Sequence, residues 1–171
     1  RCWHAVVLYP DEFRSRFEEV DEAGVVHQVE AWRSGESWAA GPLILSLAEV
    51  AAGGQGHGHN LVIHECAHKL DQLDGDTNGH PPLHPGMDPA AWSSAFAAAY
   101  RDLGRRALRH LRTVLDPYGA QSPAEFFAVA SEMFFDDPPG LQRGYPAVYA
   151  QLALFYRQDP AARSPSPLAP L

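Results

Sequence analysis

The sequence predicts an α+β domain, a small antiparallel or mixed sheet followed by helices. Three observations support this fold class. Segments with strand-like composition are confined to the first third of the chain, and the segments after residue 60 have helical patterns with recognisable caps. The chain has 171 residues, of which 46% are hydrophobic, enough for one core. We therefore expect a single domain over residues 1–160 and a disordered, proline-rich tail over residues 161–171.

Three segments in the first third are predicted strands. WHAVVLYP (3–10) is rich in strand formers and stops at a proline, and VVHQVEAW (25–32) alternates after the turn signal DEAG. GPLILSLAEV (41–50) is dense in Leu and Ile, which suits a buried strand. The charged segment between the first two, DEFRSRFEEV (11–20), is expected to form a short helix.

The helical part begins at Asn60, a good N-cap for the run that follows it. A second helix is predicted from Pro89 to about Arg109, because aspartate precedes proline at its start. SPAEFFAVASEMFFDDPPG predicts a third helix that ends at the double proline, and YPAVYAQLALFYRQDP predicts a final amphipathic helix.

Charge and composition exclude several classes of function. Thirteen Lys and Arg against twenty-one Asp and Glu leave a net charge of −8, which disfavours direct binding to nucleic acid or anionic lipid. The longest apolar run, PLILSLAEVAA, contains Glu49 and is too short to span a bilayer. Cys2 and Cys66 lie far apart, so we expect no disulfide framework and a reducing, cytoplasmic location.

The segment NLVIHECAHKLDQLDG contains a possible metal site. His64, Glu65 and His68 form an H-E-x-x-H motif, and a spacing of four residues puts both imidazoles on one face of a helix, as one tetrahedral Zn²⁺ requires. Glu65 lies beside that face and could act as a general base on a water molecule. A chance match with two surface histidines is the alternative. The helical context and the order of strands before helix favour a zinc peptidase.

A catalytic zinc site needs a third protein ligand, and the spacing leaves three candidates. Asp74 lies six residues after His68, but Asp71 stands where a glycine turn would be needed to bring it back. Glu125 and Glu132 are seven residues apart on one predicted helical face, and a glutamate from a downstream helix is the gluzincin arrangement. Glu125 also fits a helix-capping box, so spacing alone does not choose between the two.

Four segments, in order GPLILSLAEV, HNLVIHECAHKLDQLDG, DPYGAQSPAEFFAVASEMFF and LFYRQDP, closely resemble the Mlc titration factor A family of zinc peptidases, whose active site is similar to that of the anthrax lethal factor catalytic domain. The resemblance covers about residues 3–160. It implies a zincin-like domain of the gluzincin type with His64, His68 and Glu125 as zinc ligands and Glu65 as the base.

The lethal factor resemblance also implies that Tyr118 stabilises the transition state, whereas a tyrosine in this turn-rich segment could simply pack against the sheet. Asp71 and Glu132 are further candidates to accept a hydrogen bond from a ligand imidazole.

Two functions of different classes follow from these observations. In the first, the protein hydrolyses peptides, with aminopeptidase-like cleavage implied by the resemblance, and the substrate adds beside an edge strand such as LILS (43–46). In the second, also implied by the family name, the protein binds and sequesters a transcriptional repressor of sugar uptake, and peptidase activity is secondary.

Overall fold

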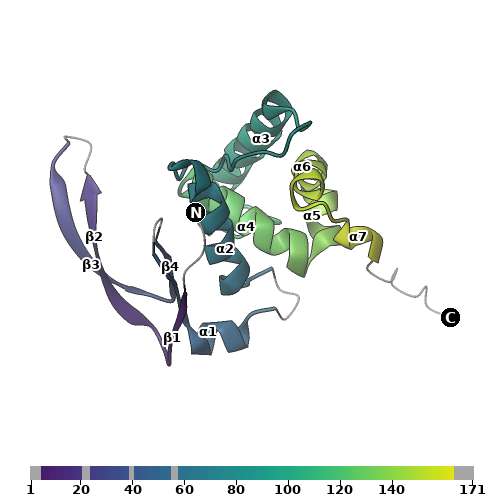
Figure 1. Ribbon diagram of the computed structural model, residues 1–171. Coiled ribbons are helices and arrows are strands. Elements are labelled where there is room, and N and C mark those ends of the chain that lie inside the picture. Colours follow the sequence, from purple (N-terminus) through teal and green to yellow (C-terminus); the bar gives the residue numbers. More distant parts are fainter. Residues whose placement is uncertain (1–4, 21–23, 39–40, 55–57, 164–171) are drawn as a thin grey trace.

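The computed structural model describes residues 5–20, 24–38, 41–54 and 58–163, and these residues form an α+β fold. Two small sheets come first along the chain and helices follow, as the sequence predicts. Figure 1 shows the strands on one side of the molecule and the helices on the other. The predicted α+β fold class is therefore confirmed, whereas the predicted arrangement of the strands is not.

The first sheet has three strands and is mixed. Its order is β1 (Val6–Tyr9), β5 (Leu43–Ser46), β4 (Gly35–Ser37), with β1 parallel and β4 antiparallel to β5. The predicted strand over residues 41–50 is thus shorter than expected. Its second half forms the helix α1 (Leu47–Ala52), because the Ser46 side chain caps that helix by accepting a hydrogen bond from the Glu49 N–H.

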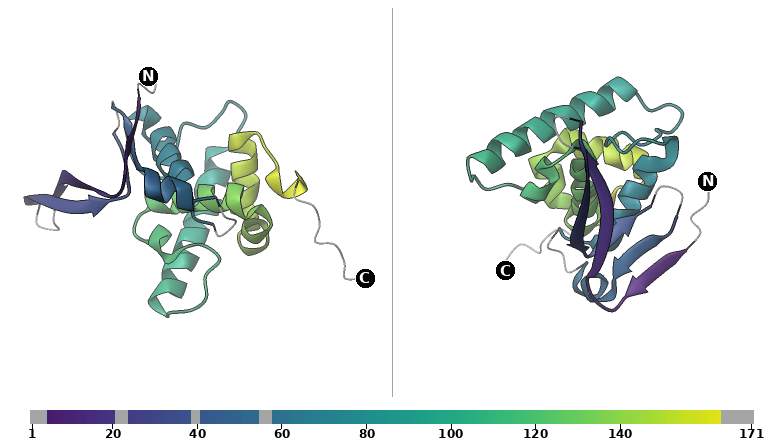
Figure 2. Two further views of the ribbon diagram at one scale, coloured as in Figure 1. Left: turned by 90° about the horizontal axis from the view of Figure 1, so that it is seen from below. Right: turned by 90° about the vertical axis from the view of Figure 1, so that its left-hand side faces the viewer.

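The second sheet is a long antiparallel hairpin of β2 (Phe13–Val20) and β3 (Val26–Arg33) that projects from the body of the fold (Figure 2). The expected helix over residues 11–20 is therefore wrong. The segment alternates with a period of two: Phe13 and Ser15 are buried, whereas Arg14 and Arg16 are exposed and pair with Glu30 across the hairpin. The single sheet that we predicted is also wrong, since the described strands form two.

The predicted helices are present. They are α2 (Leu61–Asp71), α3 (Pro89–Leu108), α4 (Pro123–Asp136) and α6 (Pro146–Tyr156), and the side chains of Asn60, Asp88 and Ser122 cap the first three. The structure also contains two short 3-10 helices, η1 (Gln72–Asp74) and η2 (Pro117–Ala120). The helix α5 (Pro138–Gly144) was not expected either: it starts at the double proline, because Asp137 caps it by accepting a hydrogen bond from the Gly140 N–H.

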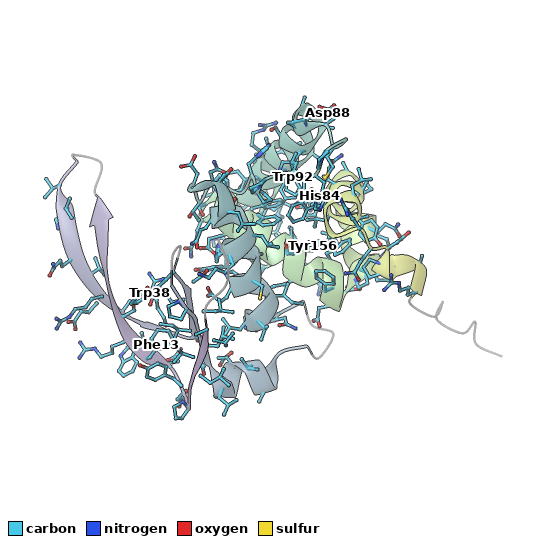
Figure 3. The ribbon with its side chains drawn as sticks, in the orientation of Figure 1. Phe13, Trp38, His84, Asp88, Trp92 and Tyr156 are labelled. Atoms are coloured by element: carbon cyan, nitrogen blue, oxygen red, sulfur yellow. The ribbon has the colours of Figure 1, made fainter. Side chains whose placement is uncertain are left out.

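The main core lies among the helices, with α4 at its centre. Ten of the fourteen residues of α4 are buried, and α2, α3, α5 and α6 pack around it. Trp92 of α3 stacks on Phe96 and also contacts Phe127 and Phe155, and Figure 3 shows Trp92, His84 and Tyr156 among the helices. This packing fixes α4 against α2, which carries the H-E-x-x-H motif.

Helix α2 packs against both the sheet and the other helices. Leu61 joins a small cluster with Leu43 and Leu45 of the sheet, whereas Ala67 joins the main core. The helix is therefore wedged between sheet and helices, and it is buried on several sides.

The end of the described chain is a short helix, α7 (Pro160–Arg163). It includes the first three residues of the predicted tail, and the remainder of that prediction, residues 164–171, lies outside the described residues. None of the helices in the described ranges combines the length and hydrophobicity that crossing a bilayer requires.

Candidate metal centre

The two motif histidines meet on one face of α2. Asn60 fixes the start of the helix by accepting a hydrogen bond from the Ile63 N–H at 3.2 Å. One turn of helix separates His64 from His68, and their Nε2 atoms lie 3.1 Å apart. Two ring nitrogens this close favour a shared proton or cation between them, because their lone pairs otherwise repel.

Glu125 reaches the same point from the first turn of α4. Its backbone N–H donates to the Ser122 hydroxyl at 3.2 Å, so this glutamate does belong to a helix cap. Its carboxylate, however, faces the histidines: Oε2 lies 3.1 Å from His64 Nε2 and 3.5 Å from His68 Nε2. The two interpretations of Glu125 from the sequence are therefore compatible, since the cap uses the backbone and leaves the side chain available.

These three atoms fit a tetrahedral zinc ion. Zn²⁺ binds imidazole nitrogen and carboxylate oxygen at about 2.0–2.1 Å, which places neighbouring ligand atoms about 3.3 Å apart in a tetrahedron. The separations among His64, His68 and Glu125 are 3.1, 3.1 and 3.5 Å. Among the described residues, this is the one cluster of three such side chains close enough to hold a metal ion.

The electrostatics of the cluster also favour a cation. Burial lowers the pKa of His64, but the carboxylates of Glu125 and Glu132 outweigh it and raise that pKa to about 10. Burial raises the pKa of Glu125, and the two histidines overcome this and lower it to about 2. The carboxylates around the two histidines therefore favour a positive charge at this point, which a divalent ion would supply.

Glu132 supports His64 from behind. It is almost completely buried, and its Oε1 lies 2.7 Å from His64 Nδ1. Its Oε2 accepts a hydrogen bond from the Asn60 N–H at 2.5 Å. A carboxylate beside Nδ1 keeps the proton on that nitrogen and leaves the lone pair of Nε2 available for a metal ion. Glu132 therefore lies where it can orient the His64 ring, and not where it could bind the same ion as His64, His68 and Glu125.

Neither Asp71 nor Asp74 belongs to the cluster of His64, His68 and Glu125. Asp71 is fully buried, and its Oδ2 accepts from the Gly79 N–H at 2.8 Å. Its Oδ1 and the Nδ1 of His68 are both buried, and neither has a hydrogen-bond partner in the described part of the chain. Asp74 is exposed on η1 and does not join the cluster.

Glu65 is held between α2 and the sheet. Its side chain is 6% exposed and faces Gly35 of β4, where an added Cβ would lie 2.6 Å from Glu65 Oε1. Burial raises the pKa of the Glu65 carboxyl, against the opposing charges of His64 and His68. A carboxylate with a raised pKa next to a candidate metal site is suited to accept a proton near neutral pH.

Tyr118 lies on η2 beside the histidines. Its ring centroid is 6.0 Å from that of His64, and the side chain is 46% exposed. Asp116 fixes this turn by accepting a hydrogen bond from the Tyr118 N–H at 2.8 Å. The tyrosine therefore borders the open space in front of the cluster and does not pack into the core.

These side chains line one cleft of about 1050 Å³. Its walls are the end of β3, β4, α2, η2 and α4, and its lining includes five acidic residues: Glu36, Glu65, Asp116, Glu125 and Glu132. Arg33 is the one Lys or Arg that lines this cleft in the described ranges. An acidic cleft that contains a candidate cation site is suited to a ligand that carries a positive group and a polarisable carbonyl.

Several residues of the cleft were missed by reasoning from the sequence. Gly35 and Glu36 belong to a strand of three residues, which is too short to show a periodicity, and Arg33 lies one residue beyond the predicted strand 25–32. The segment RSGES gave only a turn signal, and its pairing with LILS depends on tertiary structure.

The chain was compared with known proteins. Residues 1–157 match the model of the family described as glucose-regulated metallo-peptidase M90. Relatives named Mlc titration factor A are 41% identical over 164 residues in Edwardsiella ictaluri and 40% identical over 164 residues in Yersinia enterocolitica. A third, from Klebsiella pneumoniae, is 37% identical over 163 residues. Each match covers 94% of this chain and 61–62% of the relative, so the chain spans about three fifths of their length.

Proposed function

Because the chain belongs to the glucose-regulated metallo-peptidase family M90, we propose that it is a zinc-dependent peptidase whose metal is held by His64, His68 and Glu125. The observation that carries this proposal is the convergence of their three ligand atoms at separations of 3.1, 3.1 and 3.5 Å. A fourth position remains for water or substrate, as a catalytic site of the gluzincin type requires.

The protein residues around that point can perform each proton transfer of peptide hydrolysis. A zinc ion bound there would polarise the substrate carbonyl and lower the pKa of a water molecule. The Glu65 carboxylate would take the proton of the attacking water and then deliver it to the leaving amine nitrogen. Burial, the largest influence, raises the pKa of the Tyr118 hydroxyl. That hydroxyl is therefore protonated at neutral pH and could donate to the carbonyl oxygen as negative charge develops on it.

The structure changes the expected strand for substrate binding. β5, with the sequence LILS, is the middle strand of its sheet, so it has no free edge; β4 is the edge strand beside the cleft. The Ser46 N–H donates to the Ser34 carbonyl at 2.6 Å, which makes these two residues a hydrogen-bonded pair. By alternation, the backbone groups of Gly35 point away from β5, where an extended peptide could pair with them in antiparallel fashion.

Aminopeptidase-like cleavage is part of the proposal. The excess of carboxylates in the cleft suits the free amino group of a substrate.

The relatives share the name Mlc titration factor A, and this name favours a second candidate function in which the chain binds a transcriptional repressor and hydrolysis is secondary. A cytoplasmic location belongs to both candidates.

The Glu65→Gln substitution tests the peptidase proposal. It keeps the shape of the side chain but removes the base, so hydrolysis of a short peptide should fall about 100-fold or more, while zinc content stays at the wild-type level. Glu49→Gln, at a glutamate outside the cleft, is the matched control and should retain activity. Undiminished hydrolysis by Glu65→Gln would refute the role of this residue. If the wild-type protein holds zinc and cleaves no peptide, the repressor-binding function takes precedence.

A further inference from the structure

Arg33 is the basic residue that faces the acidic cleft. It ends β3 and lies opposite the buried Phe13 in the hairpin register. Along β3 the half-buried residues alternate with exposed ones, so Arg33 shares the inner face with Ala31, whereas Trp32 points outward and is 65% exposed. Arg33 is therefore half-buried on the inner face of the strand, and it lines the cleft.

The charge of Arg33 reaches the groups that perform the proposed chemistry. Arg33, Glu65 and Tyr118 line the same cleft, so the positive charge of Arg33 acts in the space where the proposed chemistry would take place. A guanidinium carries five N–H groups in a planar fork, so it can bind more than one acceptor at a time. A guanidinium in such a position is suited to bind a carboxylate.

The direction of β4 tells which end of a peptide would meet Arg33. Gly35 adjoins Glu65 and hence the scissile bond, and β4 runs from Gly35 to Ser37. An antiparallel peptide would enter from the Ser37 side, and its residues after the scissile bond would continue past Gly35. Arg33 lies two residues before Gly35, about 6.6 Å along an extended chain, which corresponds to the first residues on the leaving side.

We infer that Arg33 forms a carboxylate-binding subsite on the leaving side of the cleft. This inference rests on the proposed peptidase function, and it narrows the substrate class to peptides that carry a carboxylate shortly after the scissile bond. The carboxylate could be the C-terminus of a short peptide or the side chain of Asp or Glu. The acidic remainder of the cleft would disfavour such a ligand, so its recognition depends on this one residue.

Binding to the zinc-loaded Glu65→Gln protein tests the inference without any turnover. Three peptides are compared: trialanine with a free C-terminus, trialanine amide, and the amide with glutamate as its third residue. We expect the free acid, or both carboxylate-bearing peptides, to bind about tenfold more tightly than trialanine amide, since a charge-assisted pair is formed. Preference for the free acid alone identifies the C-terminus as the ligand, and preference for both identifies any carboxylate.

Adding Arg33→Gln should bring the affinities of the three peptides to within about twofold of one another. The matched control is Arg14→Gln, which removes the same charge from the exposed face of the same hairpin and should preserve the preference. Equal affinities before the substitution, or a preference that survives Arg33→Gln, would overturn the subsite. Peptide hydrolysis by the unsubstituted chain is measured separately, so a failure of the peptidase function is distinguished from a failure of the subsite.

Discussion

At the scale of single residues, Glu132 is the side chain that connects the start of α2 to the candidate metal site. One carboxylate oxygen is beside His64 Nδ1 and the other accepts from the backbone N–H of Asn60, the cap of the same helix. Both oxygens act as acceptors, and the side chain is 2% exposed. Orientation of His64 and integrity of the helix start therefore depend on the same buried group.

Glu132→Gln should weaken zinc binding without removing it. The amide keeps the volume but has one acceptor oxygen in place of two, so one of the two contacts is lost. We expect zinc affinity to fall about ten- to a hundredfold, measured by competition with a chelator of known affinity. A ligand role for Glu132 would instead abolish binding, and an unchanged affinity would mean that its contact to His64 is not important.

The residue scale also shows which parts of the site are predictable from the sequence. His64, Glu65 and His68 lie within one helical turn, so their arrangement follows from local geometry. Glu125 and Glu132 occupy one helix far along the chain, and only the packing of α4 on α2 determines which of them reaches the ligand point and which lies behind His64. The resemblance to a known family, not the spacing, favoured Glu125.

At the scale of elements, the contact of β4 with α2 shapes the reaction space. Gly35 has no side chain, and an added Cβ would lie 2.6 Å from Glu65 Oε1 and 2.8 Å from Leu61 Cδ1. Leu61 belongs to the cluster with Leu43 and Leu45 that joins α2 to the sheet. The strand edge and the Glu65 carboxylate, the proposed general base, can therefore lie side by side only because position 35 is glycine.

Gly35→Ala should impair hydrolysis more than folding. Because the methyl group would push the Glu65 carboxylate from its place, we expect kcat to fall about tenfold to a hundredfold while zinc content is unchanged. Gly104→Ala is the control: position 104 lies within α3 and nothing lies within 4 Å of the added Cβ, so its activity should match the wild type. A normal kcat in Gly35→Ala would show that Glu65 does not need this space.

Elements whose signals are local were predicted well, and those that depend on distant partners were not. The starts of three helices were predictable from Asn60, Asp88 and Ser122, because each of these side chains caps its helix through a hydrogen bond to a residue at most three positions later. The charged segment of β2 has helical propensity, but its pairing with β3 prevails. The aspartate before α5 and the two prolines at its start are typical both of the end of one helix and of the start of another, so they did not predict α5.

At the scale of the whole molecule, the helical core and the small sheet contribute different parts of the candidate site. The helical core fixes α4 against α2, and the small sheet supplies an edge beside the cleft, with a projecting hairpin that brings Arg33 to its rim. The chain spans about three fifths of the length of its relatives, and the peptide and repressor partners therefore stay proposals for the whole protein.

The central claim is that His64, His68 and Glu125 hold one zinc ion, and metal content tests it most directly. Purified wild type, Glu125→Gln and Asp74→Ala are measured side by side, with circular dichroism to confirm folding; Asp74 is the exposed alternative ligand. We predict one zinc per chain in the wild type and in Asp74→Ala, and its loss or severe weakening in Glu125→Gln, whose amide is a poor zinc ligand. Full zinc occupancy and unchanged affinity in Glu125→Gln, or a wild type that binds no zinc, would contradict the account.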